Sequence, residues 1–102
     1  MAVKKQYLKS KPFCKVTFRI PGEVAKEYKK ASIVGDFNSW NPTKSKMSKL
    51  KKDGSFSLSL DLETGKEYQF KYMLDKDIWI NESEADKFVG NEFGSENSVI
   101  TV

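Results

Sequence analysis

Hydrophobic and polar residues alternate along several short stretches of this chain. The clearest stretches are CKVTFRI (residues 14–20), SFSLSLDL (55–62) and KEYQFKYML (66–74), in which every second side chain is apolar or aromatic. This period of two is that of a β-strand with one buried face. Shorter apolar runs predict further strands at residues 31–34, 78–80 and 98–102.

Turn residues separate these stretches, and no segment has the pattern of a stable helix. Residues 23–30 (EVAKEYKK) have room for a single helical turn but are short and rich in lysine, so a loop is predicted there. A long polar loop is predicted over residues 81–95. Short strands joined by turns indicate an all-β fold, either an immunoglobulin-like antiparallel β-sandwich or a small barrel.

The chain is long enough for a single hydrophobic core. Its 102 residues match the size of one domain, and no internal repeat or linker divides them. We therefore expect one domain over residues 12–102. Residues 1–11 are rich in lysine and are expected to be a flexible basic tail.

The side to which Trp79 points depends on the hairpin that follows residue 74. With a three-residue loop over 75–77, Met73 lies opposite Trp79, and the indole shares the outer face of the sheet with Lys71. With a two-residue loop, Tyr72 lies opposite Trp79 and the ring is buried. The dipeptide DK lacks the Gly or Asn of a tight type I′ turn, whereas the second aspartate of DKD tolerates a left-handed position. The three-residue loop is therefore predicted.

A second tryptophan stands in the segment VGDFNSWNP (residues 34–42), just before an Asn-Pro turn signal. Gly35 is expected to give the backbone freedom to turn out of the strand, and Phe37 is expected to pack into the core. Trp40 is then left for the surface. We predict that it faces the same groove as Trp79.

An exposed Trp beside an exposed Lys has the chemistry of a sugar-binding surface. The flat apolar face of a pyranose packs on an indole ring, while Lys and Asn side chains hydrogen-bond its hydroxyls. The structural alternative is that Trp40 and Trp79 belong to the core, where tryptophan is usually buried, and that Lys71 is a solvated strand lysine.

Composition narrows the function classes. The single cysteine and the absence of His leave no intramolecular disulfide, no cysteine zinc site and no histidine general base, so no metal or cofactor is predicted. A glycosidase would need paired carboxylates across a cleft. Glu82, Glu84 and Asp86 cluster instead in one polar loop and are expected to be solvated surface. We therefore predict that the chain is not an enzyme.

Charge and hydropathy further limit the partners. The net charge is +4, and lysines concentrate in the N-terminal segment and in KSKMSKLKK (residues 44–52). These runs lack the interleaved aromatic residues of a nucleic-acid groove, so no nucleic-acid partner is expected. No run approaches the roughly 18 apolar residues of a membrane span, and residues 1–11 contain no apolar h-region, so neither membrane insertion nor export is expected. We expect a cytoplasmic monomer without a membrane partner.

Several segments, in this order, resemble carbohydrate-binding module family 48: VGDFNSWNP, DGSFSLSLDLETGKEYQFKYMLD, Trp79 and FGSENSVITV. This family includes the glycogen-binding domain of the AMP-activated protein kinase beta subunit and the N-terminal domains of isoamylase and glycogen branching enzymes. The resemblance covers residues 14–102. It implies an immunoglobulin-like β-sandwich of the early-set type that binds α-1,4-linked glucan, as glycogen, starch or maltooligosaccharide.

The resemblance also implies which side chains contact the sugar. They are Trp40 and Trp79 as stacking platforms, Lys71 and Asn97 as hydroxyl partners, Phe93 as an apolar wall and Ser95 as a hydroxyl contact. Two loops depart from the kinase-type members: LDKDIW is one residue longer than their tight Asp-Gly hairpin, and INESEADKFVGNEF is more acidic and lacks their Asp-Pro.

A second function is compatible with the same resemblance. Many members of the family sit beside a glycosidase barrel and serve it structurally. The alternative is therefore a docking module for a separate carbohydrate-active enzyme, such as a glycoside hydrolase or branching enzyme, or for a regulatory partner. It predicts a collapsed site, for instance with Trp79 turned inward.

Overall fold

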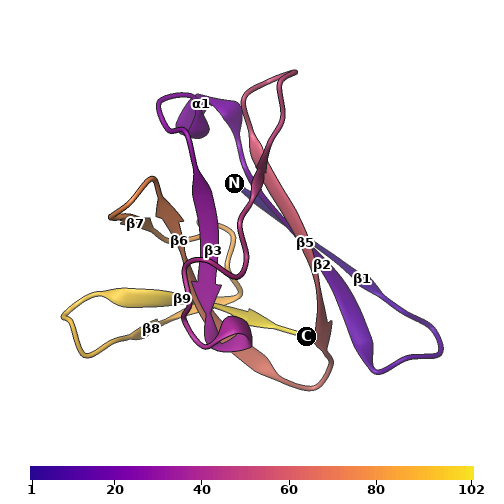
Figure 1. Cartoon of the computed structure of the whole chain (residues 1–102). Coiled ribbons are helices and arrows are strands. Elements are labelled where there is room, and N and C mark those ends of the chain that lie inside the picture. The colour runs from indigo at the N-terminus through magenta and orange to yellow at the C-terminus, as the bar shows by residue number, and fades with distance from the viewer.

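The computed structural model describes the whole chain, residues 1–102, as two antiparallel sheets that pack against each other (Figure 1). The first sheet contains, in spatial order, β1 (Ala2–Tyr7), β2 (Phe13–Ile20), β5 (Phe56–Glu63) and β4 (Ser48–Lys49). The second contains β3 (Ala31–Gly35), β6 (Glu67–Leu74), β9 (Glu96–Thr101) and β8 (Lys87–Gly90), and β7 (Ile78–Ile80) also pairs with β6. The predicted all-β antiparallel sandwich is confirmed.

Two short helical segments complete the structure, α1 (Gly22–Ala25) and η1 (Asp36–Asn38). α1 lies where a loop was expected, and its four residues are the single helical turn for which that segment has room. The two-residue strand β4 was not predicted either. Elements of two to four residues are too short to show a hydrophobic period, so the alternation of apolar and polar residues cannot predict them.

The core lies between the sheets, where the alternation places apolar side chains. Phe18 of β2 packs against Phe70 and Tyr72 of β6, and all three side chains are fully buried. The ring centroids of Phe18 and Phe70 are 5.2 Å apart in an edge-to-face arrangement, which is a favourable geometry for aromatic pairs. Because this face of β6 belongs to the core, the alternate residues of the strand, including Lys71, lie on its outer face.

The β6–β7 hairpin has the predicted three-residue loop. Met73 lies opposite Trp79, so the indole is on the outer face of the second sheet, as expected. The left-handed residue of the loop is Asp75, with φ 53°, and not the aspartate at position 77 that was predicted. Hydrogen bonds from another loop explain why Asp75 takes the left-handed position. Its carboxylate accepts them from the backbone N–H groups of Lys29 and Lys30 at 2.9 and 3.1 Å.

The flexible tail predicted for residues 1–11 is wrong for Ala2–Tyr7, which form β1 and pair with β2. Val3, Lys5 and Tyr7 lie on one face of β1, opposite buried residues of β2. Lys5 stands in the middle of this face, and its charge interrupts the apolar alternation that would have predicted the strand. An inward-pointing charge is a known protection for the edge strand of a sheet.

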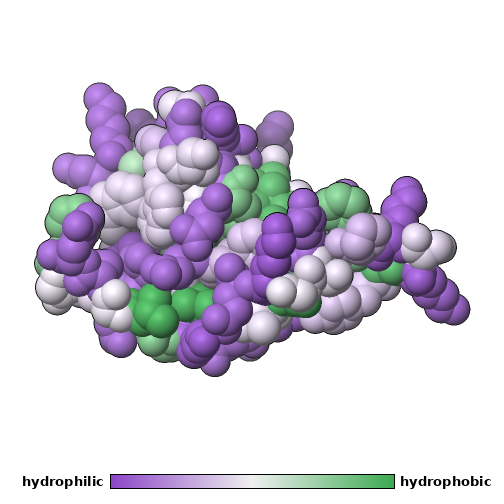
Figure 2. All heavy atoms as spheres, turned by 90° about the horizontal axis from the view of Figure 1, so that it is seen from below, coloured by the Kyte–Doolittle hydropathy of each residue, from purple (hydrophilic) through white to green (hydrophobic).

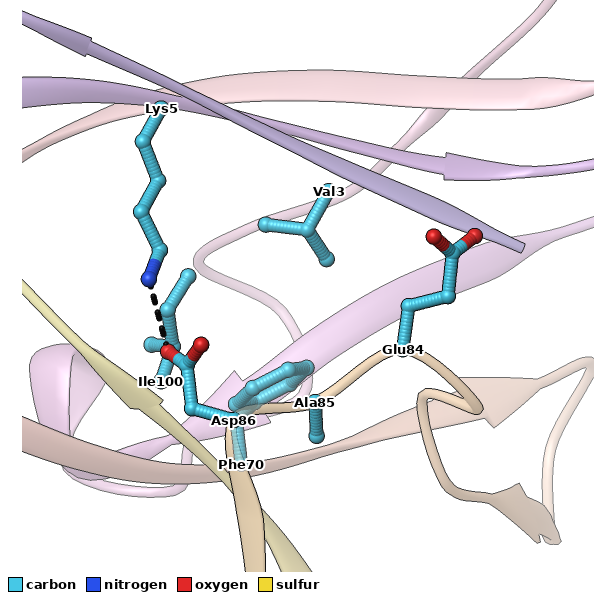
Figure 3. Close-up of a pocket in the computed structure, with 7 residues that line it drawn as sticks. All are labelled: Val3, Lys5, Phe70, Glu84, Ala85, Asp86 and Ile100. Atoms are coloured by element: carbon cyan, nitrogen blue, oxygen red, sulfur yellow. Dashed lines mark hydrogen bonds and ion pairs between the residues drawn. The ribbon is translucent and has the colours of Figure 1, made fainter.

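Lys5 fastens this edge strand to the opposite sheet (Figure 3). Its ammonium donates hydrogen bonds to the Asp86 carboxylate at 2.7 Å and to the Thr101 carbonyl at 2.9 Å. A gap of about 280 Å³ beside this ion pair is lined by Val3, Lys5, Phe70, Glu84, Ala85, Asp86 and Ile100. Phe70 and Ile100, which expose almost no surface, are its buried residues, and the lysine and the two acids lie at its exposed side.

The segment 81–95, expected to be a polar loop, contains β8 and a fully buried carboxylate. Glu82, expected at the solvated surface, has no exposed area. The Tyr72 hydroxyl donates to Glu82 Oε1 at 2.7 Å, and the Glu84 backbone N–H donates to Oε2 at 2.8 Å. These bonds replace water and explain how an acid is accommodated in the core. Burial, together with the neighbouring Glu82, raises the pKa of Tyr72.

The surface is mostly polar. Figure 2 shows the end of the molecule opposite α1, where hydrophilic side chains cover most of the face and hydrophobic residues form separate patches. Such divided patches do not indicate a large apolar interface on this face. None of the helices has the length and hydropathy needed to cross a bilayer.

Candidate functional site

A groove of about 780 Å³ lies on the outer side of the second sheet, within the size range of ligand sites. It is lined by Asp36, Trp40, Gln69, Lys71, Trp79, Asn91, Glu92, Phe93, Ser95 and Asn97. This set contains all the residues that were expected to contact a sugar. They come from the segment after β3, from β6 and β7, from the segment that joins β8 to β9, and from β9 itself, which carries Asn97.

The loop that carries Trp40 is held at its base by the two residues that precede its turn. Phe37 packs on the core, with its ring 6.3 Å from that of Phe18 and 6.0 Å from that of Tyr68. The buried Asn38 side chain donates to the Ile33 carbonyl at 2.8 Å. Ser39 and Trp40 then both take left-handed φ angles of 57°, which turn the chain outward. Trp40 is left 36% exposed at the rim of the groove.

Gly35 brings the end of β3 into direct contact with β6. A Cβ at this position would lie 2.4 Å from the Gln69 carbonyl oxygen and 2.7 Å from the Phe70 Cβ. Its φ of −172° is extended backbone that any residue adopts, so the predicted role of turning the chain is wrong. Glycine is required because the two strands approach too closely for a side chain.

Asp36 connects Trp40 to the floor of the groove. Its Oδ1 accepts a hydrogen bond from the indole Nε1 of Trp40 at 3.0 Å, and its Oδ2 accepts one from the backbone N–H of Gln69 at 2.8 Å. Both oxygens of one carboxylate are therefore engaged. This arrangement restricts the orientation of the indole plane relative to β6.

Lys71 on β6 and Trp79 on β7 line the groove together with Trp40. Trp79 is 46% exposed, which leaves much of its ring free for stacking. The Lys71 ammonium donates a hydrogen bond of 3.3 Å to the Ser95 hydroxyl. An ammonium has three hydrogens, so this single bond leaves two of them for a ligand.

The loop over residues 91–95 is organised by the side chain of Asn91. Its Oδ1 accepts hydrogen bonds from the backbone N–H groups of Phe93 at 2.9 Å and Ser95 at 3.1 Å. Gly94 provides a left-handed φ of 76° between them. Phe93 is 85% exposed, so a large apolar ring stands in solvent on a locally ordered loop.

Asn97 lies deep in the groove and is held by two other amides. Its Oδ1 accepts a hydrogen bond from Asn91 Nδ2 at 3.0 Å, and its Nδ2 donates to Gln69 Oε1 at 3.1 Å. Asn97 is only 9% exposed. The side chain is thus fixed before any ligand arrives.

A model of the family described as the glycogen recognition site of AMP-activated protein kinase matches residues 23–102. The chain belongs to this family. The matched region includes every residue of the groove and excludes β1 and β2. No curated protein matches the chain. Members of this family are glycogen-binding modules of the family 48 type without catalytic activity, which confirms the resemblance seen in the sequence.

The groove of this glycogen-recognition module combines aromatic surfaces with fixed polar groups. Its ionisable side chains are Asp36, Lys71 and Glu92. No group of three or more His, Cys, Asp or Glu side chains is placed to hold a metal ion. Such a surface can bind a neutral, hydroxyl-rich ligand, because the aromatic rings pack on its apolar faces and the polar groups hydrogen-bond its hydroxyls.

Part of the groove lies outside the set that was predicted from the sequence. Gln69 stands two residues before Lys71 on the same strand, so the strand period was a usable signal for it. Asp36, Asn91 and Glu92 had no such signal, because their placement depends on how two loops meet the sheet.

Proposed function

We propose that this chain binds α-1,4-linked glucan, as glycogen, starch or maltooligosaccharide, without transforming it. The observation that carries the proposal is that Trp40 and Trp79, both exposed, line one groove together with Lys71. Membership of a glycogen-binding family supports the same function. We further propose that the module acts as a monomer in the cytoplasm.

Each groove residue has a role in this proposal. Trp40 and Trp79 stack on successive parts of the glucan, and Phe93 packs against it as an apolar wall. Lys71, Ser95 and Asn97 hydrogen-bond the sugar hydroxyls. An α-1,4-linked chain is curved and a β-1,4-linked chain is straight, and we propose that a groove lined by both Trp40 and Trp79 selects the curved chain.

The balance between the apolar surface buried on the two indoles and the cost of association predicts a weak affinity for the glucan. Two indole rings that each bury roughly 100 Å² of apolar surface contribute about 5 kcal/mol at ~25 cal/mol per Å². Association costs roughly 4–15 kcal/mol, so the hydrogen bonds decide whether binding is measurable. A dissociation constant between about 1 μM and 1 mM is expected.

Tryptophan fluorescence provides a direct test. The chain has two Trp residues and both line the groove, so any change in emission reports on the site. Titration with maltoheptaose or glycogen should change the emission, and cello-oligosaccharide should not. Trp79→Ala should abolish binding, while Tyr7→Ala, which removes an exposed aromatic ring outside the groove, should leave it intact. No spectral or amide chemical-shift change at millimolar maltoheptaose would refute the proposal.

The exposure of Trp79 favours sugar binding over the docking alternative. Loss of sugar binding was expected to accompany a Trp79 ring turned inward, and this ring is 46% exposed. Docking on a separate glycoside hydrolase or branching enzyme is a distinct proposal, and co-purification from the source cell tests it. Release of reducing sugar from maltoheptaose by the purified chain would contradict the non-catalytic role.

A further inference from the structure

We propose that Asn91 sets the direction of a relay of side-chain amides, which leaves Gln69 and Asn97 facing the groove as hydrogen-bond donors. Asn91 is then a positioning residue and Gln69 is an additional sugar contact. The atoms recognised on this floor are hydroxyl oxygens that act as acceptors. The inference deepens the proposed function and rests on it.

The direction of the relay begins at two backbone groups that can only donate. The N–H groups of Phe93 and Ser95 both point at the side chain of Asn91, at 2.9 and 3.1 Å. The atom that they face must therefore be the amide oxygen, Oδ1. Asn91 Nδ2 then points to the other side, where Asn97 lies.

Each following amide is oriented by the one before it. Asn91 Nδ2 donates to Asn97 Oδ1 at 3.0 Å, so Asn97 turns its own Nδ2 toward Gln69. Asn97 Nδ2 donates to Gln69 Oε1 at 3.1 Å. The free end of Gln69 is therefore Nε2, because an amide has one oxygen and one nitrogen.

The relay presents donors to the ligand. Gln69 Nε2 has no acceptor in the protein, and one hydrogen of Asn97 Nδ2 is also unused. Lys71 adds its ammonium, and because the Ser95 oxygen accepts from Lys71, the Ser95 hydroxyl keeps its own hydrogen to donate. An array of donors fits the vicinal hydroxyl oxygens that every α-1,4-linked glucose residue offers.

Asn91→Asp separates this role from the folding of the loop. Aspartate still accepts from the N–H groups of Phe93 and Ser95, but it has no hydrogen for Asn97 Oδ1. The matched control is Asn41→Asp. Asn41 Oδ1 also accepts from a backbone N–H two residues on, that of Thr43, at 2.9 Å, and this residue does not line the groove. We expect Asn91→Asp to weaken maltoheptaose binding roughly three- to tenfold and Asn41→Asp to leave it unchanged.

Gln69→Glu tests the direct contact at the other end of the relay. Glutamate keeps an oxygen for Asn97 Nδ2 but presents no donor to the sugar. A loss of roughly three- to tenfold is again expected, and here the side-chain amide resonances of Asn97 should keep their positions. In Asn91→Asp those resonances should move while the backbone amide resonances of loop 91–95 stay close to those of the wild type.

The outcomes distinguish this inference from the function on which it rests. If the wild-type chain does not bind maltoheptaose, the proposed function fails. If the wild-type chain binds and both variants bind equally well, the relay is wrong and the function stands. Weaker binding by Asn91→Asp accompanied by loss of the loop resonances assigns Asn91 a merely structural role and also overturns the inference.

Discussion

The indole N–H of Trp40 and the carboxylate of Asp36 are joined by a hydrogen bond of 3.0 Å. The second oxygen of that carboxylate accepts the backbone N–H of Gln69 at 2.8 Å. One acid thus links an exposed aromatic ring to the strand beneath it. Ring orientation matters for stacking, because the contact area falls quickly when the two faces are tilted.

Asp36→Ala is expected to weaken maltoheptaose binding roughly three- to tenfold and to cost about 1–2 kcal/mol of stability, because it leaves the Gln69 N–H without its acceptor. Asp36→Asn should rescue only part of this loss, since one oxygen cannot serve both donors. The Trp40 indole N–H resonance should shift in both variants. Asp61→Ala, at an exposed site on β5, is the control, and an equal effect there would contradict this role for Asp36.

The long strands and the hairpin register were predictable because they depend on local periods. Alternation located the strands of the core, and the residues of the DKD loop placed Trp79 on the outer face. β1 was not predicted because Lys5 interrupts the apolar alternation of that strand. The ion pair that accommodates Lys5 is made with Asp86, which is far away in the sequence. The position of Glu82 in the core likewise depends on Tyr72, a partner on another strand.

The close approach of β3 and β6 predicts a severe effect for Gly35→Ala. The added methyl would meet backbone and Cβ atoms at 2.4 and 2.7 Å, so the strands must separate beneath the groove. We expect a loss of about 1–3 kcal/mol in the free energy of unfolding, measured in urea. Gly90→Ala is the matched control, because nothing lies within 4 Å of a Cβ there and the change should be close to neutral. Equal stability of the two variants would contradict the close approach.

The buried Glu82 predicts a contrast between two substitutions. Glu82→Ala removes the acceptor of the Tyr72 hydroxyl and of a backbone N–H, and should cost about 2–4 kcal/mol. Glu82→Gln should cost less than about 1 kcal/mol, because its oxygen can accept the backbone N–H while its amide donates to the tyrosine oxygen. Thermal unfolding measures both. Equal losses in the two variants would show that the hydrogen bonds are not what matters at this position.

The two faces of β6 serve different parts of the protein, because one face packs in the core and the other lines the groove. Phe70 and Tyr72 are fully buried, whereas Gln69 and Lys71 line the groove. Substitutions on the outer face should therefore change affinity more than stability. The hydrogen bonds that join Asp36 and Asn97 to Gln69 were not predictable from sequence, because only the fold brings these residues close.

Acid pH should destabilise the protein through Asp53, which closes the turn before β5. Hydrogen bonds from the Ser55 hydroxyl and backbone N–H, followed by the Arg19 guanidinium, lower the pKa of Asp53 from 3.8 to about 2. A carboxyl group whose pKa is lower in the folded state stabilises the protein above its unfolded pKa, and this contribution disappears as the pH falls through the folded value. The loss should therefore occur between about pH 4 and pH 2.

Urea unfolding of the wild type and of Asp53→Asn measures this contribution. The variant should be less stable than the wild type at pH 7, and the difference should shrink as the pH falls toward 2, where the wild-type carboxyl is also becoming protonated. Ser55→Ala removes the largest cause of the lowered pKa, so its stability should depend less on pH over the same window. A difference between the wild type and Asp53→Asn that stays constant from pH 7 to pH 2 would show that this carboxylate does not contribute to the acid sensitivity.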